Sequence, residues 1–367
     1  MFVRSLRALA TALLLLVVSA CDLNSDSLFR SKSDASDLQE LLISGSALGT
    51  SYHIKLLLPA GSEQAFSQDT LGDDIQALID HLDRSMSTYK PDSELNQFNR
   101  HPIGEPFAVS AELLEVLLLA KQIHGLTGGA FDPTIAPLVD LWGFGPRDTG
   151  DRVPSDAEIS ALREVVNFDA LVIQVQDNTS DAENTFTKTS EVTLDLSAIA
   201  KGYIVDRIAS FLLDLGVENF LVELGGELRL EGHNARDEFW KIAVEVPVLE
   251  QGQIQRVLSL TKVGLATSGD YRNYFERDGE RYSHTIDPRK GYPITHKLAS
   301  VTVLAPTAAE ADAFATGFMV MGKDEALSLA ETLDLPVLLL VKDAAGFKEY
   351  YTKAFQPYLV GELDGEK

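Results

Sequence analysis

The chain has 367 residues, of which 45% are hydrophobic, and its 55 acidic and 31 basic side chains give a formal net charge of -24. This length is enough for one large domain or two fused lobes around a buried core. The negative charge argues against a nucleic-acid-binding protein or a partner of anionic membrane surfaces, because phosphate groups would be repelled. An anionic ligand would need a cation or local hydrogen-bond donors to bind here.

Residues 1–20 have the pattern of a signal peptide. Arg4 and Arg7 flank the start of an apolar run, Ala8 to Val18, that is too short to span a bilayer. The next residues, Val18-Ser19-Ala20-Cys21, resemble a bacterial lipobox, and Cys21 is the sole cysteine of the sequence, so no internal disulfide can form. We therefore expect Cys21 to carry a lipid anchor. The alternative is a plain secretory peptide followed by a stray thiol.

The residues after Cys21 suggest a location and a domain plan. Asp22 resembles the signal that retains lipoproteins in the inner membrane of some Gram-negative bacteria, which places the protein on the periplasmic side. Residues 21–40 are rich in Ser and Asp, a composition typical of a flexible tether. We expect one folded domain over residues 41–360 and a polar tail over 361–367.

The domain is predicted to begin with a strand and a helix. Residues 48–56 alternate well enough for a strand, and residues 73–86 carry apolar side chains at the period of an amphipathic helix. Residues 87–94 form a loop, because Pro91 stops any helix before it. Tyr89 in this loop could stack on a planar ligand, and an exposed loop tyrosine is the alternative.

A second helix is predicted over residues 110–124, capped by Ser110 and ended by glycines. Two glycine-containing loops follow, at residues 129–133 and 141–146. Small residues around an aromatic ring and an acid allow the backbone to approach a flat ligand closely. The alternative is a connector that places Phe131 and Trp142 in the core.

The middle of the chain is predicted to pass from strand to helix at Asp195. A helix at 154–166 and strands at 170–175 and 191–196 precede a helix that ends at Gly216. Asp195 stands directly before that helix. It either caps the helix or hydrogen-bonds a ribose or ring edge, with Lys201 near phosphate.

The rest of the chain reads mainly as antiparallel hairpins with inserted helices, which predicts an α+β fold. The predicted elements are a strand at 220–224 with a tight turn at Gly225-Gly226, strands at 240–246 and 257–262, a polar turn at 266–271, a hairpin turn at 277–280, a strand at 299–304, a helix at 326–333 and a strand at 337–341.

A candidate active-site region lies between Ser283 and Gly317. Thr307 and Glu310 have the spacing of a capping box, so a helix is expected to begin there. That helix places Asp312 and Thr316 on one face, where they could give two oxygen ligands to Mg²⁺. The alternative is an ordinary helix with a polar stripe. The turn around His284 comes before the helix and favours the functional interpretation.

Several other site types have no motif in the sequence. It contains no Walker loop, no dinucleotide-binding Gly-x-Gly-x-x-Gly, no Gly-x-Ser-x-Gly elbow and no His-Glu-x-x-His pair. A zinc site built on cysteines is excluded by the cysteine count.

Six motifs together carry a resemblance to a known family. They are Gly129-Ala130-Phe131-Asp132-Pro133, Asp195-Leu196-Ser197-Ala198-Ile199-Ala200-Lys201-Gly202, Gly225-Gly226-Glu227, Ser268-Gly269-Asp270-Tyr271, His284-Thr285-Ile286-Asp287-Pro288 and Glu310-Ala311-Asp312-Ala313. In this order they resemble the ApbE family of flavin transferases, over about residues 45–358. The resemblance implies an α+β fold related to the T-fold, with a mixed, largely antiparallel sheet core, packed helices and a second lobe.

The resemblance also implies an activity. FAD would be split at its pyrophosphate, AMP would leave, and FMN would be joined to a Thr or Ser hydroxyl of an acceptor protein. Acceptors of the family include subunits of sodium-pumping NADH:quinone reductase and of related membrane complexes. Two alternatives stay open, which are an FAD pyrophosphatase that releases FMN and AMP, and a flavin-binding lipoprotein without enzymatic activity.

The resemblance implies roles for particular residues. Mg²⁺ would be held by the backbone carbonyl of Ala198 and by the side chains of Asp312 and Thr316. The flavin site would include Leu48, Tyr89, Ala130, Phe131, Asp132, Asp195, Lys201 and Ile286. The acceptor hydroxyl needs a base, and we expect His284 to supply it, because its pKa can lie near working pH. The alternative for His284 is a structural role in ordering the Asp287-Pro288 turn.

Overall fold

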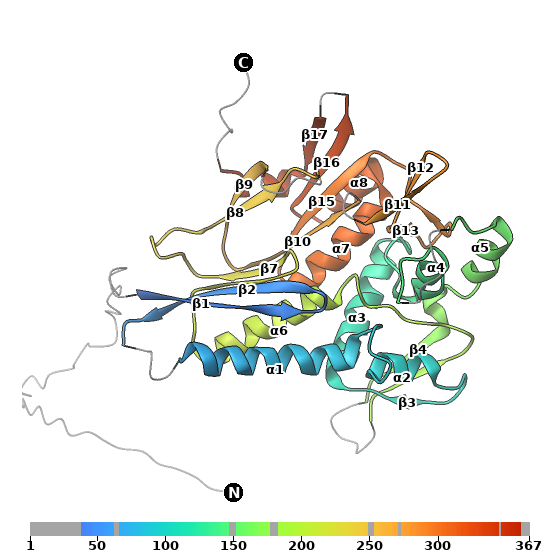
Figure 1. The fold of residues 1–367 in the computed structure, drawn as a ribbon, viewed down its shortest axis with the longest axis horizontal. Helices are drawn as coiled ribbons and strands as arrows, with labels where there is room; N and C mark the ends of the chain where they lie inside the picture. The colour runs from blue at the N-terminus through green and yellow to red at the C-terminus, as the bar shows by residue number, and fades with distance from the viewer. Residues whose placement is uncertain are drawn as a thin grey trace, which may run out of the picture. The chain divides into compact units, whose positions relative to one another are not determined.

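An eight-stranded antiparallel sheet forms the centre of the structure (Figure 1). Its strands, in spatial order, are β1 (Leu38–Ala47), β2 (Thr50–Pro59), β6 (Phe220–Leu224), β7 (Glu227–Glu231), β10 (Val263–Gly269), β15 (Leu298–Ala305), β16 (Val337–Asp343) and β17 (Gly346–Tyr351). This computed structural model describes residues 38–61, 66–146, 152–176, 183–248, 253–270, 273–344 and 346–360. The predicted signal peptide, Cys21, most of the tether and the tail lie outside the described residues.

Helices and four small sheets complete the fold. The helices are α1 (Gln68–Met86), α2 (Glu94–Arg100), α3 (Ala111–Leu126), α4 (Ala136–Leu141), α5 (Asp156–Arg163), α6 (Ala200–Asp214), α7 (Ala308–Met321) and α8 (Lys323–Thr332), with 3₁₀ turns at Pro133–Ile135, Phe168–Ala170 and Lys353–Tyr358. The small sheets pair β3 (Phe107–Ala108) and β4 (Leu171–Gln174) with β5 (Thr185–Lys188), β8 (Trp240–Glu245) with β9 (Ile254–Leu260), β11 (Tyr274–Arg277) with β12 (Glu280–Ser283), and β13 (Ile286–Asp287) with β14 (Tyr292–Pro293). The predicted α+β class is confirmed.

The central sheet is buried on both faces. In β16, Val337 and Leu339 join the large core under the helices, whereas Leu338 and Leu340 join a second core shared with β8 and β9. Side chains alternate between the two faces of a strand, so the continuous apolar sequence of β16 contributes residues to both cores. In Figure 1, α1 and α6 lie on one side of the sheet and the β8–β9 hairpin on the other.

Two of the predicted helix caps are present. The Ser110 hydroxyl accepts a hydrogen bond from the Leu113 amide at 3.2 Å, and the Thr307 hydroxyl accepts one from the Glu310 amide at 3.2 Å. The return bond of the predicted capping box, from the Thr307 amide to the Glu310 side chain, does not form, and one carboxylate oxygen of Glu310 is buried without a partner. These caps set the first turns of α3 and α7.

The predicted strand at residues 191–196 is wrong. Val192, Leu194 and Leu196 are buried in alternation, as a strand would have them. However, the backbone of Leu194 pairs with a side chain, since its amide donates to Asn99 Oδ1 at 2.8 Å and its carbonyl accepts from Asn99 Nδ2 at 2.9 Å. The buried alternation that predicts a strand is present, but the Asn99 side chain supplies the hydrogen bonds that a neighbouring strand would make.

The predicted polar turn at residues 266–271 is also wrong. Residues up to Gly269 belong to β10, in the middle of the central sheet, between β7 and β15. Their small and polar side chains predict a turn, but the segment pairs with β15 and its strand packs closely against α7, most tightly at Gly264. A Cβ atom built on Gly264 would lie 2.3 Å from the Ala308 nitrogen.

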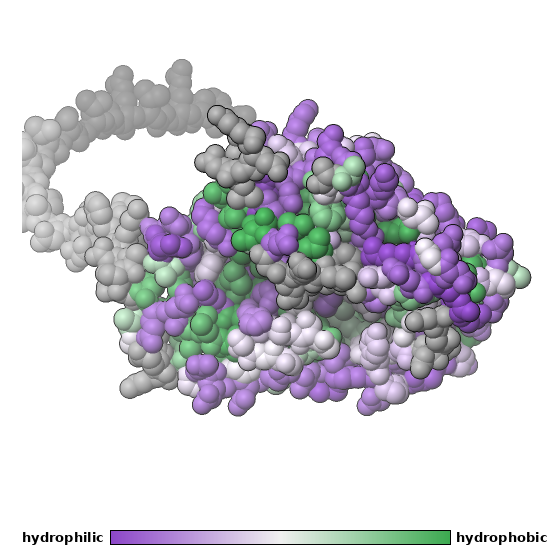
Figure 2. Space-filling view, turned by 45° about the horizontal axis from the view of Figure 1, so that its top comes forward, coloured by the Kyte–Doolittle hydropathy of each residue, from purple (hydrophilic) through white to green (hydrophobic). Residues whose placement is uncertain are grey.

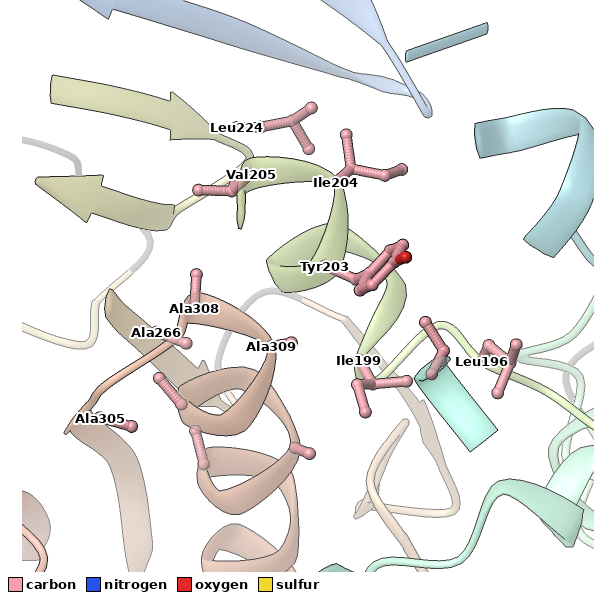
Figure 3. Close-up of a cluster of buried hydrophobic side chains, with 14 of the residues drawn as sticks. Leu196, Ile199, Tyr203, Ile204, Val205, Leu224, Ala266, Ala305, Ala308 and Ala309 are labelled. Carbon is pink, nitrogen blue, oxygen red and sulfur yellow. The ribbon is translucent and has the colours of Figure 1, made fainter. Parts of the chain in front are cut away.

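Helices α6 and α7 cross at very short range near the N-terminus of each helix (Figure 3). A Cβ atom on Gly202 would lie 2.3 Å from the Ala308 carbonyl oxygen, so the crossing requires glycine. The Asp206 carboxylate of α6 accepts hydrogen bonds from the Ala308 and Ala309 amides, both at 2.9 Å. These amides have no partner within their own helix, and Asp206 therefore caps α7 from outside.

Among the described residues, none of the helices has the length and apolar composition needed to cross a membrane. Figure 2 shows a face covered largely by hydrophilic residues with smaller apolar areas between them. This surface agrees with the large excess of acidic side chains in the sequence.

We predict that Gly202→Ala destabilises the protein by about 1–3 kcal/mol or more, because the added methyl group meets backbone that cannot move aside alone. Urea unfolding measures the change. The matched control is Gly125→Ala in α3, where a Cβ atom would meet nothing within 4 Å. That variant should keep its stability or gain up to about 1 kcal/mol. Equal effects for both substitutions would contradict the close crossing.

Candidate active site

A cavity of about 460 Å³ lies where the first turn of α6, the middle of α7 and several loops meet. Eleven of the twelve residues predicted for the flavin, metal and base roles line it, which are Tyr89, Ala130, Phe131, Asp132, Asp195, Ala198, Lys201, His284, Ile286, Asp312 and Thr316. They come from segments far apart in the sequence. The cavity is the point at which the fold brings them together.

One part of the cavity wall carries a half-buried ammonium group close to two buried acids. Lys201 Nζ forms a short ion pair with Glu227 Oε1, and Glu227 is 3% exposed. Burial and the nearby Asp312 raise the pKa of Glu227 to about 8, against the opposing effect of Lys201. Burial also raises the pKa of Asp312, and the Gly202 amide donates to Asp312 Oδ2 at 3.2 Å. Close contact between α6 and α7 therefore fixes these charges.

The residues predicted to hold a metal ion meet at this wall. Asp312 and Thr316 lie one turn apart on α7, and Ala198 lies in the turn before α6. The Thr316 hydroxyl is 3.4 Å from the Ser268 hydroxyl. No cluster of three or more His, Cys, Asp or Glu side chains suited to a metal occurs in the described parts of the chain. A cation here would depend on one carboxylate, a hydroxyl, a carbonyl and oxygens of a ligand, which is how Mg²⁺ commonly binds beside phosphates.

His284 lines the cavity, and one of its ring nitrogens holds the ring in place. Its Nδ1 lies 2.9 Å from the Asn273 carbonyl oxygen, which can only accept, so Nδ1 carries the proton. The neutral ring then has a lone pair on Nε2. Burial lowers the pKa of His284 below its ordinary value of 6.5, although the bond to Asn273 opposes this. The ring of Phe144 lies edge-on, with 6.3 Å between ring centres.

Asp287 holds the loop that follows His284. Its carboxylate is buried and accepts from Arg289 Nε at 2.9 Å and pairs with Lys290 Nζ at 2.9 Å. Burial acts against ionisation, but these bonds outweigh it and hold the pKa of Asp287 below its ordinary value. Asp287 does not line the cavity, so these bonds serve to hold the loop.

The predicted ring-binding residues form a less polar wall. The Phe131 amide donates to the Thr127 hydroxyl at 3.1 Å, which fixes the loop after α3. Asp132 Oδ1 accepts from the Thr134 amide at 2.8 Å and from its hydroxyl at 2.6 Å. Burial raises the pKa of Asp132 despite these bonds. The wall therefore combines a phenyl ring with a carboxyl group held at a fixed angle.

Asp195 and Tyr89 lie on other sides of the same cavity. Asp195 Oδ1 accepts from the Ser197 amide at 2.8 Å, and the Asp195 amide donates to the Pro133 carbonyl at 2.7 Å, tying two loops together. The expectation that Asp195 caps the helix is wrong, because α6 begins at Ala200 after Ile199 with no side-chain cap, and the bond to Ser197 closes a turn before the helix. Asp195 does line the cavity. Tyr89 is 68% exposed although it lines the cavity, so it stands at the rim.

Leu48 is the predicted flavin-site residue that does not line the cavity. The predicted strand start at this residue is wrong, because Leu48 and Gly49 form the turn between β1 and β2 with φ values of 54° and 75°. Leu48 is 36% exposed. The turn runs beside the β6–β7 turn, since the Gly225 amide donates to the Ser51 carbonyl at 3.1 Å and Gly225 does line the cavity.

Sequence reasoning missed several cavity residues. The sequence assigns no role to Glu227, because its burial depends on how β7 packs against α6. Thr267 and Ser268 were assigned to a turn, and Phe144 to a loop of uncertain purpose. Glu227 comes directly after the two-glycine turn and is the first residue of β7. An acid at this position of a strand is the signal that indicates a site residue.

Comparison with known proteins supports one family. The model of the ApbE family matches residues 48–339. A Vibrio cholerae protein named FAD:protein FMN transferase is 44% identical over 88% of this chain and 93% of the relative. A Haemophilus influenzae protein of the same name is 40% identical over 86% of this chain and 90% of the relative. Two solved structures are similar, each with a TM-score of 0.79. "Flavin Transferase ApbE from Vibrio cholerae" is 43% identical, and the match covers 88% of this chain and 100% of that chain. The apo form of Pseudomonas stutzeri flavinyl transferase ApbE is 37% identical, and the match covers 89% of this chain and 98% of that chain.

We predict that Asp287→Asn lowers the free energy of unfolding by about 1–3 kcal/mol at neutral pH, because a buried hydrogen-bonded charge is lost. Asp287 has a lowered pKa, so its stabilisation is present above the ordinary value of 3.8 and is lost as pH falls through the lower folded-state value. Urea unfolding at several pH values should therefore show that the free energies of unfolding of the wild-type protein and of Asp287→Asn become equal in acid.

Glu325→Gln is the matched control for Asp287→Asn. Glu325 binds the same Arg289 side chain at 2.9 Å, but its own side chain is 51% exposed. Its loss should cost less than about 1 kcal/mol. A larger effect for Glu325 than for Asp287 would contradict the role given to the buried carboxylate.

Proposed function

Since this chain belongs to the ApbE family, we propose that it is a flavin transferase, which moves the FMN moiety of FAD onto a hydroxyl group of an acceptor protein. The observation that carries the proposal is the cavity itself. It combines an aromatic wall, a group of oxygen ligands beside an ammonium group, and a histidine with a free ring nitrogen. A planar ring, a pyrophosphate and a nucleophilic hydroxyl need these three kinds of surface.

Binding of FAD is the first requirement. Ala130, Phe131 and Ile286 would contact the flavin ring, with Tyr89 closing the rim. Ala198, Asp312 and Thr316 would hold Mg²⁺ next to the pyrophosphate. The bound ion would supply positive charge that neutralises the phosphate oxygens. Lys201 would add a second positive charge on the same side of the cavity.

The transfer step needs a proton acceptor. The hydroxyl oxygen of the acceptor protein attacks the phosphorus of the FMN half, and its proton passes to His284 Nε2. The bond between that phosphorus and the AMP phosphate oxygen breaks, and AMP leaves with the bonding electrons. The Asn273 carbonyl would keep the imidazole in the tautomer that can accept the proton.

The acceptor and the cellular location follow as further parts of the proposal. The acceptors would be Thr- or Ser-containing segments of membrane redox proteins, such as subunits of sodium-pumping NADH:quinone reductase or related complexes. Cys21 would anchor the enzyme by lipid to the periplasmic side of the bacterial inner membrane. The anchor would keep the enzyme close to acceptors in the same membrane.

The decisive experiment mixes the purified protein with FAD, Mg²⁺ and an acceptor domain that carries the Thr motif. Mass spectrometry of the acceptor should show a gain of one FMN less water, and a chelator should abolish it. Free FMN and AMP beside an unmodified acceptor would instead favour hydrolysis. Binding of FAD without any turnover would leave a flavin-binding protein.

His284 gives a prediction about pH. An imidazole accepts a proton only when neutral, so activity should rise with pH through the pKa of His284 and stay level above it. Because burial lowers that pKa, the rise should lie below pH 6.5. The pH dependence of kcat/KM for FAD, at a saturating concentration of the acceptor protein, measures the pH at which activity rises. A rise centred well above 6.5 would contradict the assignment.

We also predict that His284→Ala lowers the rate of transfer by about 10²–10⁴-fold while FAD still binds, since a general base contributes about this much. Equilibrium binding of FAD, followed by flavin fluorescence, separates the two effects. His233→Ala is the control, because His233 is an exposed histidine that does not line the cavity. It should keep its transfer rate.

A further inference from the structure

Glu227 has one carboxyl oxygen for which the fold provides no partner. Oε1 pairs with Lys201 Nζ, but Oε2 is buried and makes no hydrogen bond to any described residue. Glu227 is 3% exposed and lines the cavity, so the free oxygen is not hydrated as a surface group would be. A buried polar atom without a partner is costly, which indicates that a ligand supplies the missing bond.

The position of the free oxygen is defined by the β6–β7 turn. A Cβ atom built on Gly225 would lie 3.6 Å from Glu227 Oε2, and Gly225 itself lines the cavity. The nearby Glu223 differs, because its two oxygens accept from the Gly226 amide at 2.8 Å and pair with His53 at 2.8 Å. Of these two acids of one hairpin, Glu227 is the one with an oxygen that lacks a partner, and it is also the one that lines the cavity.

The chemistry of the site restricts what can bind this oxygen. A phosphate or a ring carbonyl offers only acceptors and could pair with Glu227 only when the acid is protonated, and a neutral acid would give up its ion pair with Lys201. A metal ion at Oε2 would have to share one carboxyl group with the Lys201 ammonium, whereas the cation proposed at Asp312 would have a carboxylate without such an ion pair. A hydroxyl group can donate or accept, and therefore pairs with Glu227 in either protonation state.

We infer that Glu227 binds a sugar hydroxyl of the nucleotide substrate, with one carboxyl oxygen on Lys201 and the other on the hydroxyl. The inference rests on the proposed flavin-nucleotide substrate. FAD carries such hydroxyls on the ribityl chain of its flavin half and on the ribose of its AMP half. Both are sources of the same chemistry, and the experiment separates them.

The test measures affinities in matched ligand pairs, without turnover. Riboflavin and lumiflavin share the ring system, but only riboflavin has the ribityl hydroxyls. AMP and 2′,3′-dideoxy-AMP differ only in ribose hydroxyls. Each ligand is titrated into the full-length wild-type protein and the Glu227→Met variant, with flavin fluorescence for the first pair and calorimetry for the second. Within a pair, any general loosening of the cavity affects both ligands alike.

The expected result is a loss of discrimination in one pair. The wild-type protein should prefer the hydroxylated ligand of that pair, and Glu227→Met should reduce the preference about tenfold or more, as for the loss of a hydrogen bond to a charged group. A change in the riboflavin pair assigns the ribityl chain, and a change in the AMP pair assigns the ribose. Unchanged preferences in both pairs would overturn the inference.

Two controls complete the test. Glu223→Met removes the partnered acid of the same hairpin and should keep both preferences. If Glu227→Met does not fold because Lys201 is left unpaired, the double variant Lys201→Met/Glu227→Met removes both buried charges and should still lose the preference. Failure of the wild-type protein to bind riboflavin, AMP and FAD would instead reject the proposed function, which keeps the two failures distinct.

Discussion

The close crossing of α6 and α7 is the constraint on which the candidate site depends. Gly202 allows the backbones to touch, and the Gly202 amide hydrogen-bonds the Asp312 carboxylate across the contact. Asp206 adds the cap on the first amides of α7. A larger residue at the crossing would separate Lys201 on one helix from Asp312 and Thr316 on the other. The distance between the helices sets the distance from Lys201 to Asp312 and Thr316. The contact that stabilises the fold therefore also fixes the geometry of the candidate site.

The rest of the cavity is built by tying loops to this helix pair. Asp195 binds the Pro133 backbone, Thr127 binds the Phe131 amide, and Asn273 holds His284 through both its ring and its backbone amide. Each of these bonds joins or stiffens a segment that has no regular structure of its own. Loops can be positioned accurately when their polar groups are satisfied by specific partners. The core under the helices gives these loops a rigid base.

Local patterns in the sequence were sufficient for most elements and for the residues near them. The caps at Ser110 and Thr307 and the one-turn spacing of Asp312 and Thr316 depend only on neighbouring residues, and all were predictable. The strand assigned to 191–196 and the turn assigned to 266–271 failed because their conformation depends on distant partners, Asn99 in the first case and α7 in the second. Glu227 was missed for the same reason. Burial beside a lysine from another helix is not visible in a local pattern.

The charges around Lys201 act against an anion at this wall of the cavity. Two buried acids, Glu227 and Asp312, lie near one ammonium group, and burial raises the pKa of both, so each further negative charge here is unfavourable. The protein as a whole is also strongly negative. A pyrophosphate would add further negative charge to this wall, and Lys201 is already engaged by Glu227. A divalent cation held by Asp312 and Thr316, as proposed above, would offset this charge and favour binding of the pyrophosphate.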